Sequence, residues 1–64
     1  MKLYKIVLRD LDGHEIVEFE YGESRDEALE LALGRQGMSV SVKEAKAATR
    51  HELLEAVSRK HALA

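Results

Sequence analysis

The chain has no cysteine among its 64 residues. Neither a disulfide nor a zinc site with thiolate ligands can therefore stabilise it, although many small domains depend on one of these. No apolar run approaches the roughly 20 residues of a membrane-spanning helix. The first apolar segment is interrupted by Lys5 and Arg9, unlike the hydrophobic region of a signal peptide. We expect a cytoplasmic protein that does not contact membranes.

Aromatic residues are also few, since Tyr4, Phe19 and Tyr21 are the only three. A sheet that binds RNA typically stacks bases on exposed aromatic side chains. Alternation along the two predicted strands places all three aromatic side chains on one face, which we assign to the core. This assignment argues against an RNA-binding sheet.

The length and the 45% of hydrophobic residues predict one folded domain, residues 1–64. A chain this short buries only about 60% of the surface that its unfolded form exposes. Its core must be small, and self-association becomes a plausible source of additional stability.

Two apolar-rich segments, 3–11 and 15–21, flank the dipeptide Asp12-Gly13. This pattern predicts a β-hairpin with a two-residue type I′ turn, because Asp tolerates positive φ and Gly adopts it freely. The predicted core face of the hairpin consists of Tyr4, Ile6, Leu8, Val17, Phe19 and Tyr21. The acidic second strand is placed at the sheet edge and the first strand at the centre.

A helix is predicted after the hairpin, because Ser24 and Glu27 form a capping box. Apolar residues then recur at helical spacing, at Ala28, Leu29, Ala32 and Leu33. Gly34 and Gly37 are the candidate positions for its end.

A third strand begins near Met38 and reaches at least Val42. Whether residues 43–48 continue it depends on which capping box begins the last helix. We favour Thr49 with Glu52, which predicts a helix from about Arg50 to His61, over an earlier start at Ser41.

A right-handed crossover from the second strand over the first places the third strand on its other side. The prediction is an α+β two-layer sandwich, with chain order ββαβα and an antiparallel sheet of order 2-1-3. Three apolar residues remain on the sheet face opposite the first helix, namely Leu3, Val7 and Ile16. Either the last helix or a second copy of the chain covers them, and they are our candidates for a dimer interface.

Charge is unevenly distributed although the net charge is only -2. Residues 10–30 contain nine acidic side chains and one basic side chain, Arg25. On the edge strand, Glu15, Glu18 and Glu20 form a candidate surface for a basic protein partner. Glu18 and Glu20 point away from the predicted core, so charge reversal there is expected to leave the fold intact.

Nucleic-acid binding is the alternative function. Its candidate residues are Lys43, Lys46, Arg50, Arg59 and Lys60. Glutamates interrupt this basic set and the isoelectric point is about 5.9, whereas duplex binding needs several phosphate contacts. The composition therefore disfavours this alternative.

No catalytic constellation is recognisable. His51 and Glu55 have the i, i+4 spacing of two metal ligands, but an ion pair on a helix explains them better. His14 has no Asp placed to orient it, and little room is expected for a substrate cavity of about 300 Å³. We expect no catalysis, no cofactor and no bound metal. The predicted function is a protein-protein interaction module, either a homodimer or a small accessory or inhibitor subunit that binds another protein.

Overall fold

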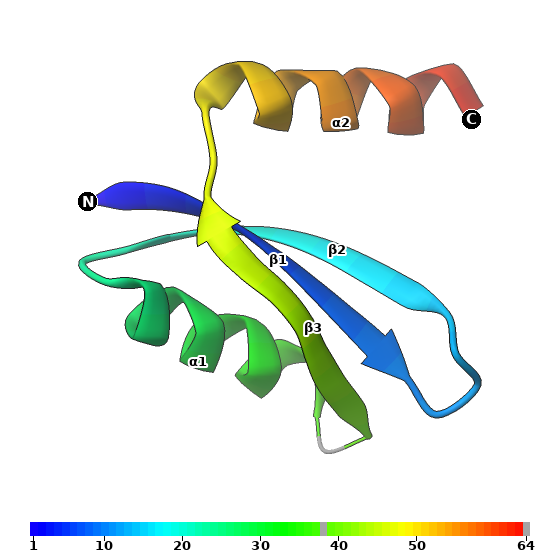
Figure 1. The fold of residues 1–64 in the computed structure, drawn as a ribbon. Coiled ribbons are helices and arrows are strands. Elements are labelled where there is room, and N and C mark those ends of the chain that lie inside the picture. Colours follow the sequence, from blue (N-terminus) through cyan, green and yellow to red (C-terminus); the bar gives the residue numbers. More distant parts are fainter. Residues whose placement is uncertain (38, 64) are drawn as a thin grey trace.

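The structure is a computed structural model that describes residues 1–37 and 39–63, without the side chains of residues 60–63. Its elements are β1 (Lys2–Asp10), β2 (Glu15–Gly22), α1 (Arg25–Gln36), β3 (Val40–Ala47) and α2 (Arg50–Leu63). The three strands form an antiparallel sheet of order β2-β1-β3. The two helices lie over opposite faces of this sheet (Figure 1). The predicted α+β class, chain order and strand order are confirmed.

Both predicted N-caps form, but only Thr49 and Glu52 make the complete capping box, because the side chain of Glu27 accepts the N–H of Glu23, at 3.3 Å, instead of that of Ser24. The backbone N–H of Glu27 donates to Ser24 Oγ at 3.2 Å. At the second helix, the N–H of Glu52 donates to Thr49 Oγ1 at 3.2 Å, and the N–H of Thr49 donates to Glu52 Oε1 at 3.2 Å. These bonds satisfy N–H groups that have no partner within the helix.

The later of the two possible helix starts is correct, because β3 continues to Ala47 and α2 begins at Arg50. Gly37 ends α1 with φ of 80°, and its N–H donates to Leu33 O at 3.1 Å. Positive φ favours glycine at this position. Met38, where we placed the start of the third strand, lies outside the described residues.

The hairpin turn differs from the prediction. Asp10 N donates to His14 O at 3.0 Å and Gly13 N donates to Asp10 O at 3.1 Å, so three residues form the loop. Gly13 has φ of 87°, but no non-glycine residue in the described part of the chain has positive φ. The type I′ turn is therefore wrong. Asp10 Oδ1 accepts the N–H groups of Asp12 and His14 at 2.9 Å each, and these bonds stabilise the three-residue loop.

This longer loop shifts the strand register by one residue. A two-residue turn would place Leu8 opposite Val17, whereas the observed partner of Leu8 is Ile16. Because side chains alternate, a shift of one residue moves every side chain of β2 to the other face. The face toward α1, called the α1 face, carries Tyr4, Ile6, Leu8, Ile16, Glu18 and Glu20. The face toward α2, called the α2 face, carries Leu3, Lys5, Val7, Val17, Phe19 and Tyr21.

The main core lies between α1 and the α1 face. Ile6, Leu8, Ala28 and Ala32 are fully buried there. Ile16 packs against this cluster, so our placement of Ile16 on the opposite face is wrong. Our placement of Val17, Phe19 and Tyr21 in the core beneath α1 is wrong for the same reason.

The turn gives the fold a pH dependence, because the N–H of His14 is the main group that lowers the pKa of Asp10 below its ordinary value of 3.8. A carboxylate with a lowered folded pKa stabilises the fold fully above its unfolded pKa, and this contribution is lost as pH falls through the folded pKa. We expect Asp10→Asn to lose less thermal stability than the wild type between neutral pH and about pH 2. Melting curves followed by circular dichroism test this, and equal acid sensitivity of the two chains would contradict it.

Candidate functional site

Helix α2 covers only part of the α2 face. Leu3 and Val7 are buried, with 7% and 6% of their surface exposed. On the same face Val17 remains 51% exposed and Tyr21 remains 44% exposed. Leu3 and Val7, two of our candidates for a dimer interface, are therefore already covered within the chain, and the apolar surface left for a second copy includes Val17 and Tyr21 instead.

A groove of about 320 Å³ lies between α2 and the sheet. We call it the α2 groove. Its lining residues are Lys5, Val17 and Phe19 from the sheet and Glu52, Glu55, Ala56 and Arg59 from α2. The four helical residues have i, i+3, i+4, i+7 spacing and therefore lie on one side of the helix. The volume is at the lower end of the range for ligand sites, so the chain has more room than we expected.

The α2 groove combines apolar side chains with two cations and two carboxylates. Glu55 Oε1 lies 3.1 Å from His51 Nε2, so the two side chains are in contact as their i, i+4 spacing predicts. Glu52 is engaged in the cap of α2. Among the described residues, neither Lys5 nor Arg59 has an ion-pair partner. Apolar groups with charged groups around them are typical of a surface that contacts another protein.

The acidic edge is less available than the sequence indicates. Arg35 of α1 forms ion pairs with both Glu18, at 3.0 Å, and Glu20. The hydrogen bond to Glu20, followed by that to Glu18, raises the pKa of Arg35 above its ordinary value. The side chains of both glutamates are only 19% exposed. They lie on the α1 face beside the core, so our prediction that they point away from it is wrong.

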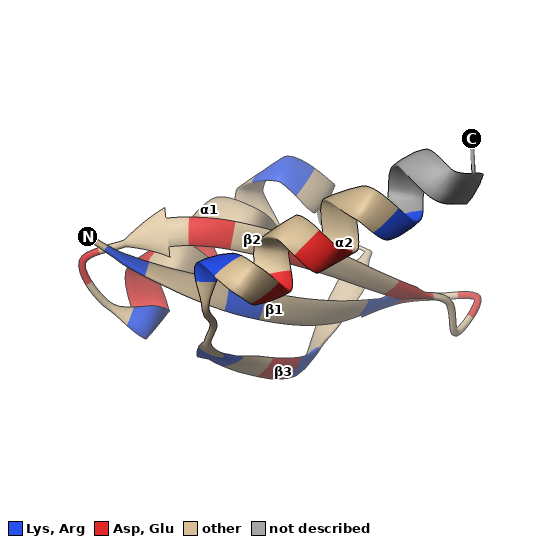
Figure 2. Cartoon of the chain, turned by 90° about the horizontal axis from the view of Figure 1, so that it is seen from above, with Lys and Arg blue, Asp and Glu red and all other residues tan. Residues whose placement is uncertain are grey.

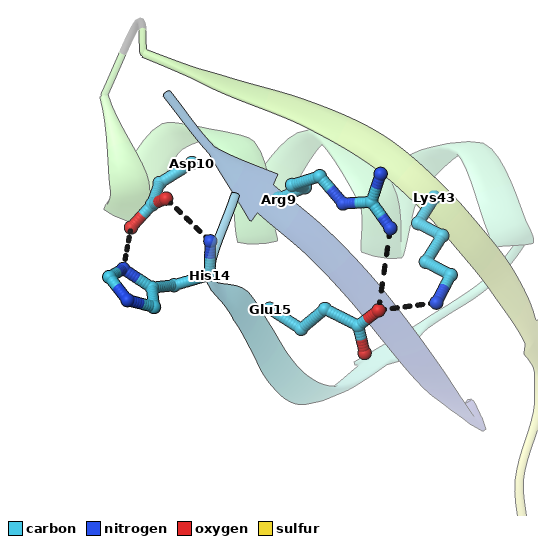
Figure 3. Close-up of polar contacts among 5 residues, drawn as sticks. All are labelled: Arg9, Asp10, His14, Glu15 and Lys43. Atoms are coloured by element: carbon cyan, nitrogen blue, oxygen red, sulfur yellow. Dashed lines mark hydrogen bonds and ion pairs between the residues drawn. The ribbon is translucent and has the colours of Figure 1, made fainter. Parts of the chain in front are cut away.

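Glu15 lies apart from the other two glutamates, on the α2 face. Its Oε2 is 3.6 Å from Arg9 Nη2 and also contacts Lys43 Nζ (Figure 3). Lys43 is the extra residue in a bulge of β3, because Val42 pairs with Leu8 and Glu44 pairs with Val7. The hydrogen bond from Lys43 is the main cause that lowers the pKa of Glu15. The fold therefore does not gather the predicted acidic residues into one surface, and it pairs each of them with a cation.

The basic set proposed for nucleic-acid binding is also divided. Lys43 pairs with Glu15, and Lys46 Nζ lies 3.5 Å from Glu44 Oε1. Arg50 and Arg59 are nine residues apart on α2 and so lie on opposite sides of it. Figure 2 shows acidic positions between the basic ones on both β3 and α2. Lys60 belongs to α2, and its side chain lies outside the described residues.

His14 has a neighbouring carboxylate after all, because its Nδ1 lies 3.5 Å from Asp10 Oδ2 (Figure 3). Ligand atoms of Asp10, Asp12 and His14 all lie within 4.8 Å of one another. The carboxylate of Asp10 already accepts two backbone N–H groups. We therefore interpret this cluster as the group that holds the hairpin turn.

Comparisons with protein-family models, with curated proteins and with solved structures find no significant match for this chain. Neither helix, in the part of the chain that the structure describes, is long and apolar enough to cross a membrane.

Sequence reasoning did not identify the α2 groove. It placed Val17 and Phe19 beneath the first helix, and it did not consider Lys5 or Ala56 as site residues. One signal in the sequence could have indicated the correct register. Asp10 lies two residues before Asp12, and an Asp side chain at that position can accept backbone N–H groups of the turn and favour a longer loop. Correct register would have placed the apolar side chains of β2 beneath the last helix.

Proposed function

We propose that this chain is a non-catalytic protein-protein interaction module that acts as a homodimer. The observation that supports it best is the incompletely covered α2 face, where Val17 and Tyr21 are both more than two-fifths exposed. Soluble monomers rarely leave large contiguous apolar surfaces open, and such surfaces typically mark contact sites.

The size of the chain supports the same proposal. A domain of 64 residues has a small core whose burial only narrowly exceeds the entropy lost on folding. Association through an apolar face buries further surface and stabilises the fold by mass action. Closed two-fold dimers are the commonest way for soluble chains to do this.

A role as an accessory or inhibitor subunit that uses the acidic edge has weaker support. Arg35 and Lys43 neutralise much of the field of Glu18, Glu20 and Glu15, so a basic partner would have to displace these cations. The cytosol as the compartment remains a prediction from the sequence.

Sedimentation equilibrium of the purified chain tests the proposal. From low micromolar to near-millimolar concentration, the fitted mass is expected to approach twice the chain mass of 7.2 kDa. The dimer fraction should rise with concentration, since association is governed by mass action. A single species with the mass of one chain over the whole range would contradict the homodimer.

A further inference from the structure

We infer that a second copy of this chain occupies the α2 groove, with the two α2 helices antiparallel across a two-fold axis. This inference rests on the proposed homodimer and adds to it the contact surface. It makes the groove side of α2 and the exposed edge of the α2 face a single interface, used identically by both copies.

The exposed area of the chain fits one side of such an interface. A compact monomer of 7.2 kDa is expected to expose about 4,100 Å², whereas this chain exposes 4790 Å². The excess of roughly 700 Å² is spread over the whole chain and shows that it is less compact than an average monomer, so surface is available for a contact of about 800 Å² for each partner. The radius of gyration, 11.9 Å, also exceeds the value of about 10.7 Å for a compact domain of this length.

The apolar surface that would be buried is continuous with the α2 groove. Val17 and Phe19 line it from the sheet, and Ala56 lines it from α2. Tyr21 lies two residues beyond Phe19 on the same face of β2 and is 44% exposed. In the groove itself the large Phe19 side chain and the small Ala56 side chain both line the surface, which offers the uneven shape that close packing between two identical surfaces requires.

The charges of the groove favour a second copy over a strongly charged partner. Lys5 and Arg59 balance Glu52 and Glu55, so the surface has no net charge with which to attract a basic or acidic protein. A two-fold axis that crosses antiparallel helices between positions 55 and 59 places Glu55 of each copy near Arg59 of the other. Such an arrangement is self-complementary, because the pair of Glu55 with Arg59 of the other copy occurs twice, once on each side of the axis.

An apolar-to-charged substitution in the groove tests the contact. Val17→Lys is expected to raise the dissociation constant of the dimer at least about tenfold, because it places an unpaired charge in the buried contact. Val42→Lys is the matched control, since Val42 is similarly exposed at 42% but lies on β3 and pairs with Leu8 of the α1 face. It is expected to leave the dissociation constant unchanged within about twofold. Circular dichroism of both variants verifies the fold.

Charge exchange tests the antiparallel arrangement of the helices. Arg59→Glu alone and Glu55→Arg alone are each expected to weaken homodimers at low salt, because like charges then face each other. A mixture of the two variants is expected to recover association to within about tenfold of the wild type. Sedimentation of the separate and mixed chains gives these values. Glu30→Arg on the exposed surface of α1 is the control, with no expected effect.

The outcomes separate this inference from the proposal on which it rests. A wild-type monomer overturns both. A dimer that Val17→Lys leaves intact, or that Leu54→Lys on another side of α2 disrupts instead, overturns the contact surface while the homodimer stands. A mixture of charge variants that stays monomeric overturns the antiparallel helix pairing.

Discussion

Ile6→Ala is expected to remove a large share of the free energy of unfolding of the chain. Ile6 is fully buried at the centre of β1, where it contacts the cluster formed with Ala28 and Ala32 of α1. Truncation of a buried isoleucine costs about 2–5 kcal/mol, because transfer free energy is lost and a cavity remains. A domain of this length has a total stability of roughly 3–10 kcal/mol, so the loss is a large share of it.

Urea unfolding followed by circular dichroism measures this effect. The matched control is Leu11→Ala, since Leu11 is 86% exposed in the hairpin loop and is expected to change stability by less than about 0.5 kcal/mol. If Ile6→Ala unfolds at the same urea concentration as Leu11→Ala, the position of the core between β1 and α1 is wrong. All chains are compared at the same protein concentration, because dimer formation makes the unfolding midpoint depend on concentration.

Most of the fold can be predicted from local signals. The caps at Ser24 and Thr49 and the glycine at position 37 define where the helices begin and end, because each satisfies backbone groups near it in the sequence. The strand order follows from the handedness of the crossover. The register was not predicted correctly, because it depends on one side chain, Asp10, which competes for the N–H groups of the turn.

The candidate site could not be predicted as well as the fold. Its residues come from β1, β2 and α2. The site can therefore be predicted only if both the register of β1 with β2 and the position of α2 over the sheet are known. Strand β2 has apolar residues on both of its faces, Ile16 on one and Val17 on the other. Its sequence pattern therefore does not show which face packs against α1, and the length of the hairpin loop decides it. The number of acidic residues in the segment 10–30 also overstates the negative charge of this surface. Arg35 of α1 and Lys43 of β3 form ion pairs with glutamates of β2.

Glu18→Lys combined with Glu20→Lys is expected to destabilise the fold by about 1 kcal/mol or more, because it leaves three cations together beside the core. The sequence alone suggested that this change would be harmless. In the structure both side chains are 19% exposed and contact Arg35, and Glu18 also accepts a hydrogen bond from Gln36. These contacts attach the last turn of α1 to the edge strand β2. Thermal and urea unfolding at low salt measure the loss.

The control for this double variant is a second double variant that changes the net charge by the same amount at exposed positions. Glu23→Lys with Glu30→Lys alters the net charge equally at exposed positions and is expected to change stability by less than about 1 kcal/mol. Arg35→Glu, introduced into the Glu18→Lys, Glu20→Lys chain, is expected to recover about half of the loss, since it restores opposite charges across the same contact. If the triple variant is no more stable than the double variant, the ion pairs with Arg35 do not stabilise the fold. The acidic edge would then again be a candidate surface for a basic partner.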